Sequence, residues 1–396
     1  MRLSSSIGRF AAVKIALAGM MAAMLVACGA PGAGGGGPGG ASFTGSTGAV
    51  KVALLLPVTS SGSTPAVAKA LKQAAELALF DFDNPNVSLV PKDTKGTPDG
   101  ARLAAESAIK DGAELIIGPL FAQEVAGAAP VARQAGIPMI AFSSDEKVAG
   151  NGVYLLSFQA GRDVPRIVSF AMSKGKRSFA QLVPQSPYGR VAESAFAKAV
   201  SGGGGETSVR AAFPTDDSNA MLGPVRQIAN AIKGGQKVDA LFLPAGREEL
   251  PSLAPLLASS DLTSGRLQFV GTGQWDYPNI GGEKALVGGW YPAPDPKGWS
   301  NFVQRYSKTY GSVPPRLASL AYDAVSLAVS LSQNPPGQRY DMGQLTRASG
   351  FAGVDGLFRQ LPDGTCERGL AILEVREGGP VVIDPAPSSF ATASSY

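Results

Sequence analysis

The chain of 396 residues contains no histidine. This absence excludes Ser-His-Asp and Cys-His catalysis, histidine-ligated zinc and haem sites, and pH switches that depend on an imidazole. Cysteine is scarce as well, since the sequence has two, Cys28 and Cys366, which are too few for a four-cysteine metal site. We therefore expect a protein that is not an enzyme and that uses no cofactor and no metal.

Charge is also sparse, because 17% of the residues are Asp, Glu, Lys or Arg and the formal net charge is +4. Three basic residues, Arg2, Arg9 and Lys14, lie in a segment that we expect to be removed, which leaves 32 basic against 31 acidic residues. A nearly neutral protein lacks the basic surface that binds phosphate backbones, so we expect no nucleic-acid partner. Hydrophobic residues make up 44% of the chain, which is enough for two lobes.

The N-terminus has the pattern of a secretory signal peptide over residues 1–27. A basic start precedes Ile15–Ala27, an uncharged and mostly apolar run of 13 residues, which is shorter than the roughly 20 that span a bilayer. The run ends in Leu25-Val26-Ala27-Cys28, which resembles the lipobox of bacterial lipoproteins. The resemblance implies lipidation of Cys28, and Gly29 after it implies sorting to the outer membrane.

Residues 28–49 are expected to be a lipidated cysteine followed by a flexible tether. Ten glycines occupy the 21 positions from 29 to 49, without any charged residue, so this segment cannot bury a core. Lipidation of Cys28 leaves Cys366 without a partner. Cys366 follows the hairpin-turn sequence Asp363-Gly364-Thr365, and we interpret it as a bystander thiol and not as a nucleophile.

From residue 50 onward, apolar runs typical of strands alternate with Ala-rich segments of helical period, which predicts βαβ units and parallel sheets. A first series extends from the strand at 52–56 to the strand at 138–142, and a second extends from 179–183 to 267–271. A helix over 317–331 and a hairpin follow. The predicted fold class is α/β, with two Rossmann-like lobes.

Ligands of such folds bind beyond the carboxyl ends of the strands, where the lobes meet. We therefore predict cleft residues from the segments that follow the expected strands. They are Ser60, Phe121, Gln123, Ser143, Ser144, Ser186, Tyr188, Arg247, Gln274 and Trp275. The glycine run at 202–205 lies between a helix and a strand, the reverse of the order in a phosphate-binding loop, and we interpret it as a turn.

Several motifs resemble, in order and spacing, those of type I periplasmic binding proteins, in the branch of leucine/isoleucine/valine-binding proteins. They are Val52-Ala53-Leu54-Leu55-Leu56-Pro57, Ile116-Ile117-Gly118-Pro119-Leu120, Ala135-Gly136-Ile137-Pro138-Met139-Ile140, Ser186-Pro187-Tyr188-Gly189-Arg190 and the ending from Gly350 to Cys366. The resemblance covers residues 50–385 and implies parallel-sheet lobes joined by three crossovers. It implies a first lobe of residues 50–158 and 285–335, a second lobe of 159–284 and 336–385, and a loose tail over 386–396.

The segments that would hold an amino acid depart from that family. Residues with hydroxyl groups are expected after the third strand, where this chain has Leu120-Phe121-Ala122-Gln123-Glu124. An acid for an α-ammonium group is not evident in Gly271-Thr272-Gly273-Gln274-Trp275. A subgroup is more similar, the LpoA/LppC-type penicillin-binding-protein activator lipoproteins. The similarity rests on Gly118-Pro119-Leu120-Phe121, the Gln274-Trp275 pair, and Tyr154-Leu155-Leu156-Ser157-Phe158 with Gly161-Arg162-Asp163.

This similarity implies an outer-membrane or periplasmic lipoprotein, held at the membrane by its lipid, that regulates peptidoglycan synthesis by contacting a penicillin-binding protein, a peptidoglycan synthase. Exposed aromatic side chains would form the contact, and the candidates are Trp275, Tyr277, Trp290, Tyr291 and Trp299. The alternative is the solute-binding lipoprotein of an ABC importer, whose partners are an ABC permease and an amino acid or another small polar ligand. The alternative predicts ligand binding with hinge closure.

Overall fold

The computed structural model describes residues 48–83 and 85–390. The predicted signal peptide, the lipidation site Cys28, the tether up to residue 47 and the last six residues of the predicted tail lie outside the described residues. Among the helices of the described part, none has the length and apolar character needed to cross a bilayer.

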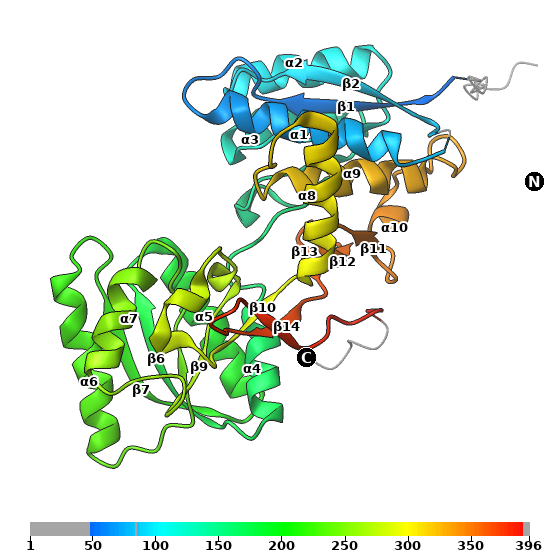
Figure 1. Cartoon of the computed structure of the whole chain (residues 1–396). Coiled ribbons are helices and arrows are strands. Elements are labelled where there is room, and N and C mark those ends of the chain that lie inside the picture. Colours follow the sequence, from blue (N-terminus) through cyan, green and yellow to red (C-terminus); the bar gives the residue numbers. More distant parts are fainter. Residues whose placement is uncertain (1–47, 84, 391–396) are drawn as a thin grey trace, which may run out of the picture. The chain divides into compact units, whose positions relative to one another are not determined.

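The first lobe is built around a five-stranded sheet in which all strands are parallel (Figure 1). Strands and helices alternate along the chain as β1 (Val50–Leu56), α1 (Thr64–Phe80), β2 (Val87–Asp93), α2 (Pro98–Lys110), β3 (Leu115–Ile117), α3 (Ala122–Gln134), β4 (Met139–Ala141) and β5 (Val153–Leu155). The strand order in the sheet is β2-β1-β3-β4-β5. Such an order places the carboxyl ends of all five strands at one edge.

Both faces of this sheet are buried. Val52 and Leu54 of β1 pack with α1 and with α9 (Ala318–Leu331), whereas Ala53 and Leu55 between them pack with α2 and α3. Successive side chains of a strand point to opposite faces, so one strand contributes to both cores. This is why residues 52–56 form an apolar run without polar alternation.

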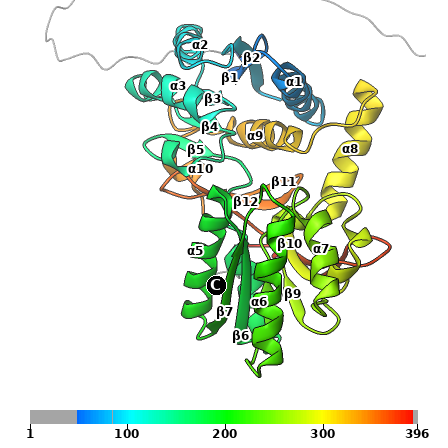
Figure 2. The ribbon, with the colours of Figure 1, turned by 90° about the vertical axis from the view of Figure 1, so that its left-hand side faces the viewer.

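The second lobe contains a seven-stranded mixed sheet in the order β15-β14-β10-β9-β8-β6-β7. The helices α4 and α5 cover one face, and α6 and α7 cover the other. Figure 2 shows α5, α6 and α7 around this sheet. The elements are α4 (Val164–Ser173), β6 (Ser178–Pro184), α5 (Pro187–Gly202), β7 (Glu206–Phe213), α6 (Leu222–Lys233), β8 (Ala240–Phe242), α7 (Leu250–Ser259), β9 (Gln268–Val270), β10 (Trp290–Ala293), β14 (Ala371–Glu374) and β15 (Val381–Asp384). The strand β14 pairs antiparallel with both β10 and the edge strand β15, and the five strands from β10 to β7 pair in parallel.

A small antiparallel sheet and two further helices follow β10. They are α8 (Pro296–Tyr310), α10 (Met342–Leu345), β11 (Phe351–Gly353), β12 (Gly356–Gln360) and β13 (Cys366–Arg368). Phe302 of α8, Tyr340 in the segment before α10 and Phe358 of β12 are buried in the core that α1 and α9 share with the first sheet. The chain therefore passes between the lobes after β5, after β10 and after β13.

The α/β fold class with parallel-sheet, Rossmann-like lobes is confirmed. Most expected strands and helices occur within a few residues of their predicted ends, but β5, α4, β10, α8, α10 and β15 were not predicted. The helix α8 buries two residues, Phe302 and Tyr306, so it has no long apolar stripe in the sequence. The strand β10 is four residues long and contains Pro292, which weakens its strand signal.

The lobe boundaries differ from the predicted ones at two crossings. We assigned 285–335 to the first lobe, yet β10 pairs with β9 and β14 in the sheet of the second lobe. We assigned 336–385 to the second lobe, yet Tyr340 and Phe358 are buried in the first-lobe core. Long-range strand pairing and core burial decide both lobe boundaries. The local sequence pattern does not show which lobe a segment joins.

The predicted loose tail is partly wrong for the residues that the structure describes. Phe390 is buried, and the guanidinium of Arg359 lies 4.6 Å from the centroid of its ring. Phe390 also approaches Gly350, where a Cβ atom would lie 2.9 Å from the ring. A single aromatic residue therefore fixes the chain against the core beyond β15.

Candidate functional site

A cavity of about 410 Å³ is lined by residues from both lobes and from all three crossings between them. Most of these residues follow the carboxyl end of a parallel strand. Ser144 follows β4, Tyr188 follows β6, and Gln274 follows β9, while Phe158 and Arg368 belong to crossing segments. This is the position at which open α/β sheets bind ligands.

Three of the predicted cleft residues, Ser144, Tyr188 and Gln274, line this cavity. The tyrosine is held by the start of α5, where Ser186 accepts a 3.1 Å hydrogen bond from the Gly189 N–H. Its hydroxyl group forms a 2.7 Å hydrogen bond with the hydroxyl group of Thr272 after β9. The Ser-Pro-Tyr-Gly motif is thus a helix cap that positions one cavity residue.

Among the described residues that line the cavity, the other seven candidates do not appear. Three of them have local partners: Ser60 donates to Pro57 O, Ser143 accepts from the Asp145 N–H, and Ser186 is the cap of α5. Turn and cap chemistry accounts for these three side chains. Gln123 donates to the carbonyl of Gly96, in the loop between β2 and α2. Phe121, at the start of α3, and Arg247, in the loop before α7, are exposed.

Trp275 is a core residue of the second lobe. Its side chain is fully buried, and its indole N–H donates a 3.1 Å hydrogen bond to the carbonyl of Leu243. Gly271 and Gly289 flank the ring so closely that a Cβ atom at either position would lie within 3 Å of it. Tyr291, another residue predicted for a partner contact, is fully buried as well. Neither side chain is available to a partner in this structure.

Two acids, Asp163 and Asp276, line the cavity from the second lobe, although we found no acid evident in the stretch 271–275. Asp276 comes directly after that stretch. Asp163 begins α4 and accepts a 2.5 Å hydrogen bond from the Gly273 N–H. Burial raises the pKa of the Asp163 carboxyl group. The expectation that this lobe offers no acid to a ligand is therefore corrected.

Two arginines, Arg316 and Arg368, line the opposite part of the cavity beside the ring of Phe158. Their guanidinium carbons lie 5.3 and 4.7 Å from the centroid of that ring, distances typical of cation–π contacts. Arg316 also lies 4.5 Å from the centroid of the Trp299 ring and forms an ion pair with the fully buried Asp355. The first lobe and the crossings thus give the cavity a cationic wall.

A second buried acid, Asp323 of α9, lies behind these arginines. It accepts a 2.7 Å hydrogen bond from the Val354 N–H. Burial, together with the nearby charge of Asp355, raises the pKa of Asp323 to about 7. Arg316 and Arg368 act in the opposite direction, since a nearby positive charge favours the ionised carboxylate.

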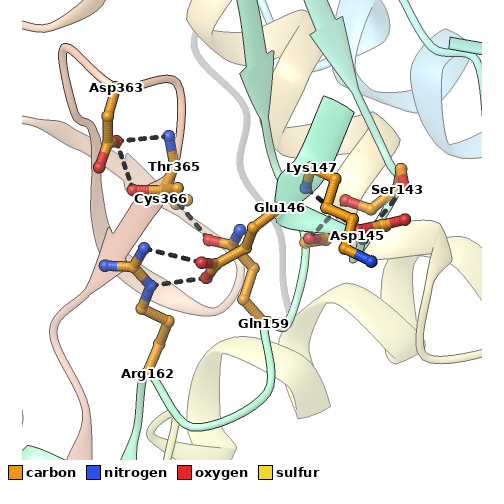
Figure 3. A network of polar contacts seen from close by, with 10 residues as sticks. Ser143, Asp145, Glu146, Lys147, Gln159, Arg162, Asp363, Thr365 and Cys366 are labelled. Carbon is orange, nitrogen blue, oxygen red and sulfur yellow. Dashed lines mark hydrogen bonds and ion pairs between the residues drawn. The ribbon is translucent and has the colours of Figure 1, made fainter. Parts of the chain in front are cut away.

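The crossing segments are tied to each other by polar contacts (Figure 3). The side-chain carbonyl of Gln159 accepts a 2.9 Å hydrogen bond from the Cys366 N–H, which joins the first crossing to β13. The guanidinium of Arg162 forms a bidentate ion pair with Glu146, with N–O distances of 2.7 and 3.1 Å. Of these hinge side chains, Arg162 was part of a motif named in the sequence, whereas Glu146 and Gln159 were not predicted to have a role.

The described residues contain no cluster of three or more acidic or cysteine side chains that could hold a metal ion. Cys366 lines the cavity but is buried and has no disulfide partner. Burial raises the pKa of its thiol to about 11, so the reactive thiolate is scarce at neutral pH. The interpretation of Cys366 as a bystander thiol agrees with this environment.

Sequence signals could have found some of the missed residues and not others. Asp163 stands before Val164-Pro165, a helix-start pattern, and Asp276 adjoins the Gln274-Trp275 pair. Arg316 and Arg368 have no such signal. They are separated by about fifty residues and meet at Phe158 because the chain crosses between the lobes three times.

The sequence profile of a protein family described as "Periplasmic binding protein" matches residues 49–380. Among curated proteins, the Leu/Ile/Val-binding protein homolog 6 of Brucella melitensis biotype 1 is 26% identical over 192 residues, which are 46% of this chain and 47% of that protein. The protein of the same name from Brucella abortus (strain 2308) is 26% identical over 149 residues, 36% of this chain and 37% of that protein. The aligned part thus spans about half or less of the length of these relatives.

Solved structures share the fold over most of the chain. A protein of Rhodospirillum rubrum described as a branched-chain amino acid ABC transporter matches with a TM-score of 0.74 and 20% identity, covering 85% of this chain and 100% of that one. A leucine binding protein of Thermotoga maritima matches with a TM-score of 0.56 and 21% identity, covering 85% and 99%. A solute binding protein of Rhodopseudomonas palustris BisB5, solved with 3,4-dihydroxy benzoic acid, has a TM-score of 0.56 and 19% identity, covering 86% and 99%.

Proposed function

Because the chain belongs to the periplasmic binding protein family, we propose that it is the solute-binding protein of an ABC importer and holds a small polar solute between its lobes. The observation that carries this proposal is the cavity of about 410 Å³, lined by both lobes and all three crossings. Its volume lies within the range of roughly 300–1,000 Å³ of small-molecule sites. The family and its structural neighbours are binding proteins and not enzymes.

The walls of the cavity suit a polar solute. Asp163, Tyr188, Gln274 and Asp276 come from the second lobe, and Arg316 comes from the first. A solute in contact with both walls would favour lobe closure, because it interacts with each lobe more completely in the closed state. Leucine and 3,4-dihydroxybenzoic acid, which appear in the names of two structural neighbours, are both small molecules that carry a carboxylate group.

The role of a penicillin-binding-protein activator receives less support. The relatives described above are amino-acid-binding or solute-binding proteins, and none of them is such an activator. The Gln274-Trp275 pair, one basis of that resemblance, consists of a cavity residue and a buried core residue. Contact with a peptidoglycan synthase remains a prediction from sequence, and we favour the importer.

The proposed location follows from the family and from the N-terminal sequence. Periplasmic binding proteins act outside the inner membrane, and the lipobox-like sequence before Cys28 would anchor the protein to a membrane facing the periplasm. The partners would be an ABC permease and the solute. Outer-membrane sorting through Gly29 remains a prediction from sequence.

Thermal unfolding with candidate solutes tests the proposed function. A solute present at roughly 100 times its dissociation constant should stabilise the protein by about 2.7 kcal/mol. Leucine belongs in the set, because the missing hydroxyl groups after β3 predict weak binding whereas Asp163 and Asp276 offer acids for its ammonium group.

A matched pair of variants locates the binding site. Ser144→Trp fills the cavity and should abolish the shift in melting temperature, whereas Ser218→Trp, at an exposed loop position outside the cavity, should leave it unchanged. Cross-linking in cells then separates the two functions. Recovery of a peptidoglycan synthase instead of permease subunits, with no solute-induced shift, would contradict the importer.

A further inference from the structure

We propose that the solute is an organic anion and that its carboxylate is held at the hinge end of the cavity by the amide of Gln159 and the guanidinium of Arg368. This inference rests on the proposed function and specifies the solute class for the same cavity. It places the carboxylate on the crossing segments and not on the loop after β3, where the chain lacks the expected hydroxyl groups.

The orientation of the Gln159 amide is determined by its surroundings. The side-chain oxygen accepts the 2.9 Å hydrogen bond from the Cys366 N–H, so the side-chain nitrogen must point the other way (Figure 3). That nitrogen is buried and has no hydrogen-bond acceptor among the described residues. Gln159 lines the cavity and directly follows Phe158. A buried donor without an acceptor is unfavourable until an acceptor arrives.

The guanidinium of Arg368 has the same need. All three of its nitrogen atoms are buried and lack a hydrogen-bond acceptor among the described residues. The group lies between aromatic rings, with its central carbon 4.7 Å from the centroid of Phe158 and 5.7 Å from that of Phe358. Arg368 and Cys366 are two residues apart on β13, so their side chains share one side of the strand. This places the guanidinium and the Gln159 amide in the same region of the cavity wall.

The neighbouring acids do not fully satisfy these donors. Asp355 forms its ion pair with Arg316 and accepts a 2.7 Å hydrogen bond from Ser319. Asp323 uses one oxygen to accept the Val354 N–H, and no ion pair joins it to Arg368 in the described structure. The raised pKa of Asp323 means that this carboxyl group is partly protonated at neutral pH. A positive charge therefore remains at this end of the cavity.

The acid wall is arranged differently. Asp163 accepts hydrogen bonds from the Gly273 N–H and from the backbone at the start of α4. Asp276 faces Arg316 across 4.0 Å. These two acids thus have donors of the protein beside them, whereas the Gln159 amide nitrogen and the Arg368 guanidinium have no acceptor among the described residues. A ligand carboxylate has the charge and the two oxygen atoms that match an arginine and an amide N–H.

Matched solutes test the predicted class. We would measure binding by isothermal titration calorimetry for three carboxylates and their amides: benzoate and benzamide, L-leucine and L-leucinamide, and succinate and succinamide. Each pair differs in charge and little in size. We expect at least one carboxylate to bind about tenfold to a hundredfold more tightly than its amide, the range that a charged hydrogen bond contributes.

Gln159→Glu tests the predicted residues. The substituted carboxylate can still accept the Cys366 N–H, but it replaces the donor with a negative charge that pairs with Arg368 inside the protein. We expect the melting temperature to stay the same or rise while carboxylate affinity falls about tenfold to a hundredfold. Gln236→Glu, an identical change on an exposed loop, should alter neither quantity. Arg368→Met should also weaken carboxylate binding. If the Arg368→Met protein does not fold, the Gln159→Glu protein still tests the inference.

The outcomes separate the inference from the proposed function. If amides bind as tightly as carboxylates, or if Gln159→Glu and Arg368→Met leave carboxylate affinity unchanged, the inference is overturned and the solute-binding function stands. If none of the six solutes binds and no other solute shifts the melting temperature, the proposed function fails and the inference fails with it.

Discussion

The guanidinium of Arg316, in the first lobe, lies 4.0 Å from the carboxylate of Asp276, in the second lobe. The same guanidinium forms an ion pair with Asp355, which is fully buried and belongs to the turn between β11 and β12. One arginine therefore pairs with a buried acid on its own side and approaches a half-exposed acid across the cavity. The two contacts should differ in their contribution to stability, because a surface ion pair contributes little and a buried one is costly to break.

Asp355→Ala should therefore lower the free energy of unfolding by about 2–3 kcal/mol, since it leaves Arg316 and the hydroxyl of Ser319 without their buried partner. Asp276→Ala should lower it by less than about 1 kcal/mol. Urea unfolding of both variants at one pH measures the difference. Equal losses of unfolding free energy in the two variants would contradict the expectation that the buried ion pair contributes more to stability than the exposed one.

Trp275→Ala should destabilise the fold by about 3–5 kcal/mol, because it empties a fully buried site and leaves the Leu243 carbonyl without its donor. Arg247→Ala, at an exposed position in the preceding loop, should change the stability by no more than about 0.5 kcal/mol. Both are measured by urea unfolding. A Trp275→Ala protein of normal stability would contradict the core assignment and restore this residue as a candidate for a partner contact.

Two glycines of α5 give a matched test of backbone packing. A Cβ atom at Gly189 would lie 1.9 Å from the carbonyl oxygen of Pro184, so Gly189→Ala should cost about 2 kcal/mol or more. Gly202 has nothing within 4 Å of its Cβ position, and Gly202→Ala should be neutral or slightly stabilising. Thermal unfolding ranks the two variants. Because Gly189 adjoins Tyr188, the first variant should also weaken any solute binding.

Asp323 should make stability depend on pH in a defined direction. Its pKa is raised to about 7 in the folded protein, so the folded state binds a proton more tightly than the unfolded chain does. The stabilising contribution is complete below about pH 4 and is lost as the pH rises through about 7.

Asp323→Asn keeps an oxygen that can accept the Val354 N–H and removes this titration. Its stability relative to the unmodified protein should therefore increase from about pH 4 to about pH 8. Asp99→Asn, at a side chain that is 91% exposed, is the control for the Asp-to-Asn change itself. Urea unfolding across this pH range measures the stability of both variants. If the stability of Asp323→Asn changes with pH in the same way as that of the unmodified protein, the raised pKa of Asp323 is refuted.

Cys28 should be the first residue of the mature protein and should carry lipid. Mass spectrometry of the membrane-extracted protein should find no peptide from residues 1–27 and an acylated Cys28. The prediction rests on the basic start, the apolar run of 13 residues and the small residues before Cys28. A Cys28→Ser protein that is processed and still fractionates with membranes would count against it.

The sequence predicted the fold more completely than the site because the two depend on different kinds of information. The apolar run at 52–56 signals a strand that is buried on both faces, and the Ala-rich segment after it signals a helix; the structure has β1 and α1 there. Tyr188 and Gln274 were found because they follow strands whose ends were predictable. Trp275 has the same local position as Gln274, but packing against Gly271 turns it into the core.

By itself the sequence determined the absence of histidine chemistry and the alternation of strands and helices, and it predicted a signal peptide with a lipid-anchored Cys28. Each of these inferences depends on residue types or on residues close together in the chain. Only the tertiary structure brings Arg316 and Arg368 to the ring of Phe158 and lets the side-chain oxygen of Gln159 accept the Cys366 N–H. It also places Asp163 and Asp276 in the lining of the same cavity as the two arginines. These groups are up to about 210 residues apart in the chain. They meet only because three crossings close the lobes around a shared hinge, and long-range burial of this kind leaves no periodic signal in the sequence.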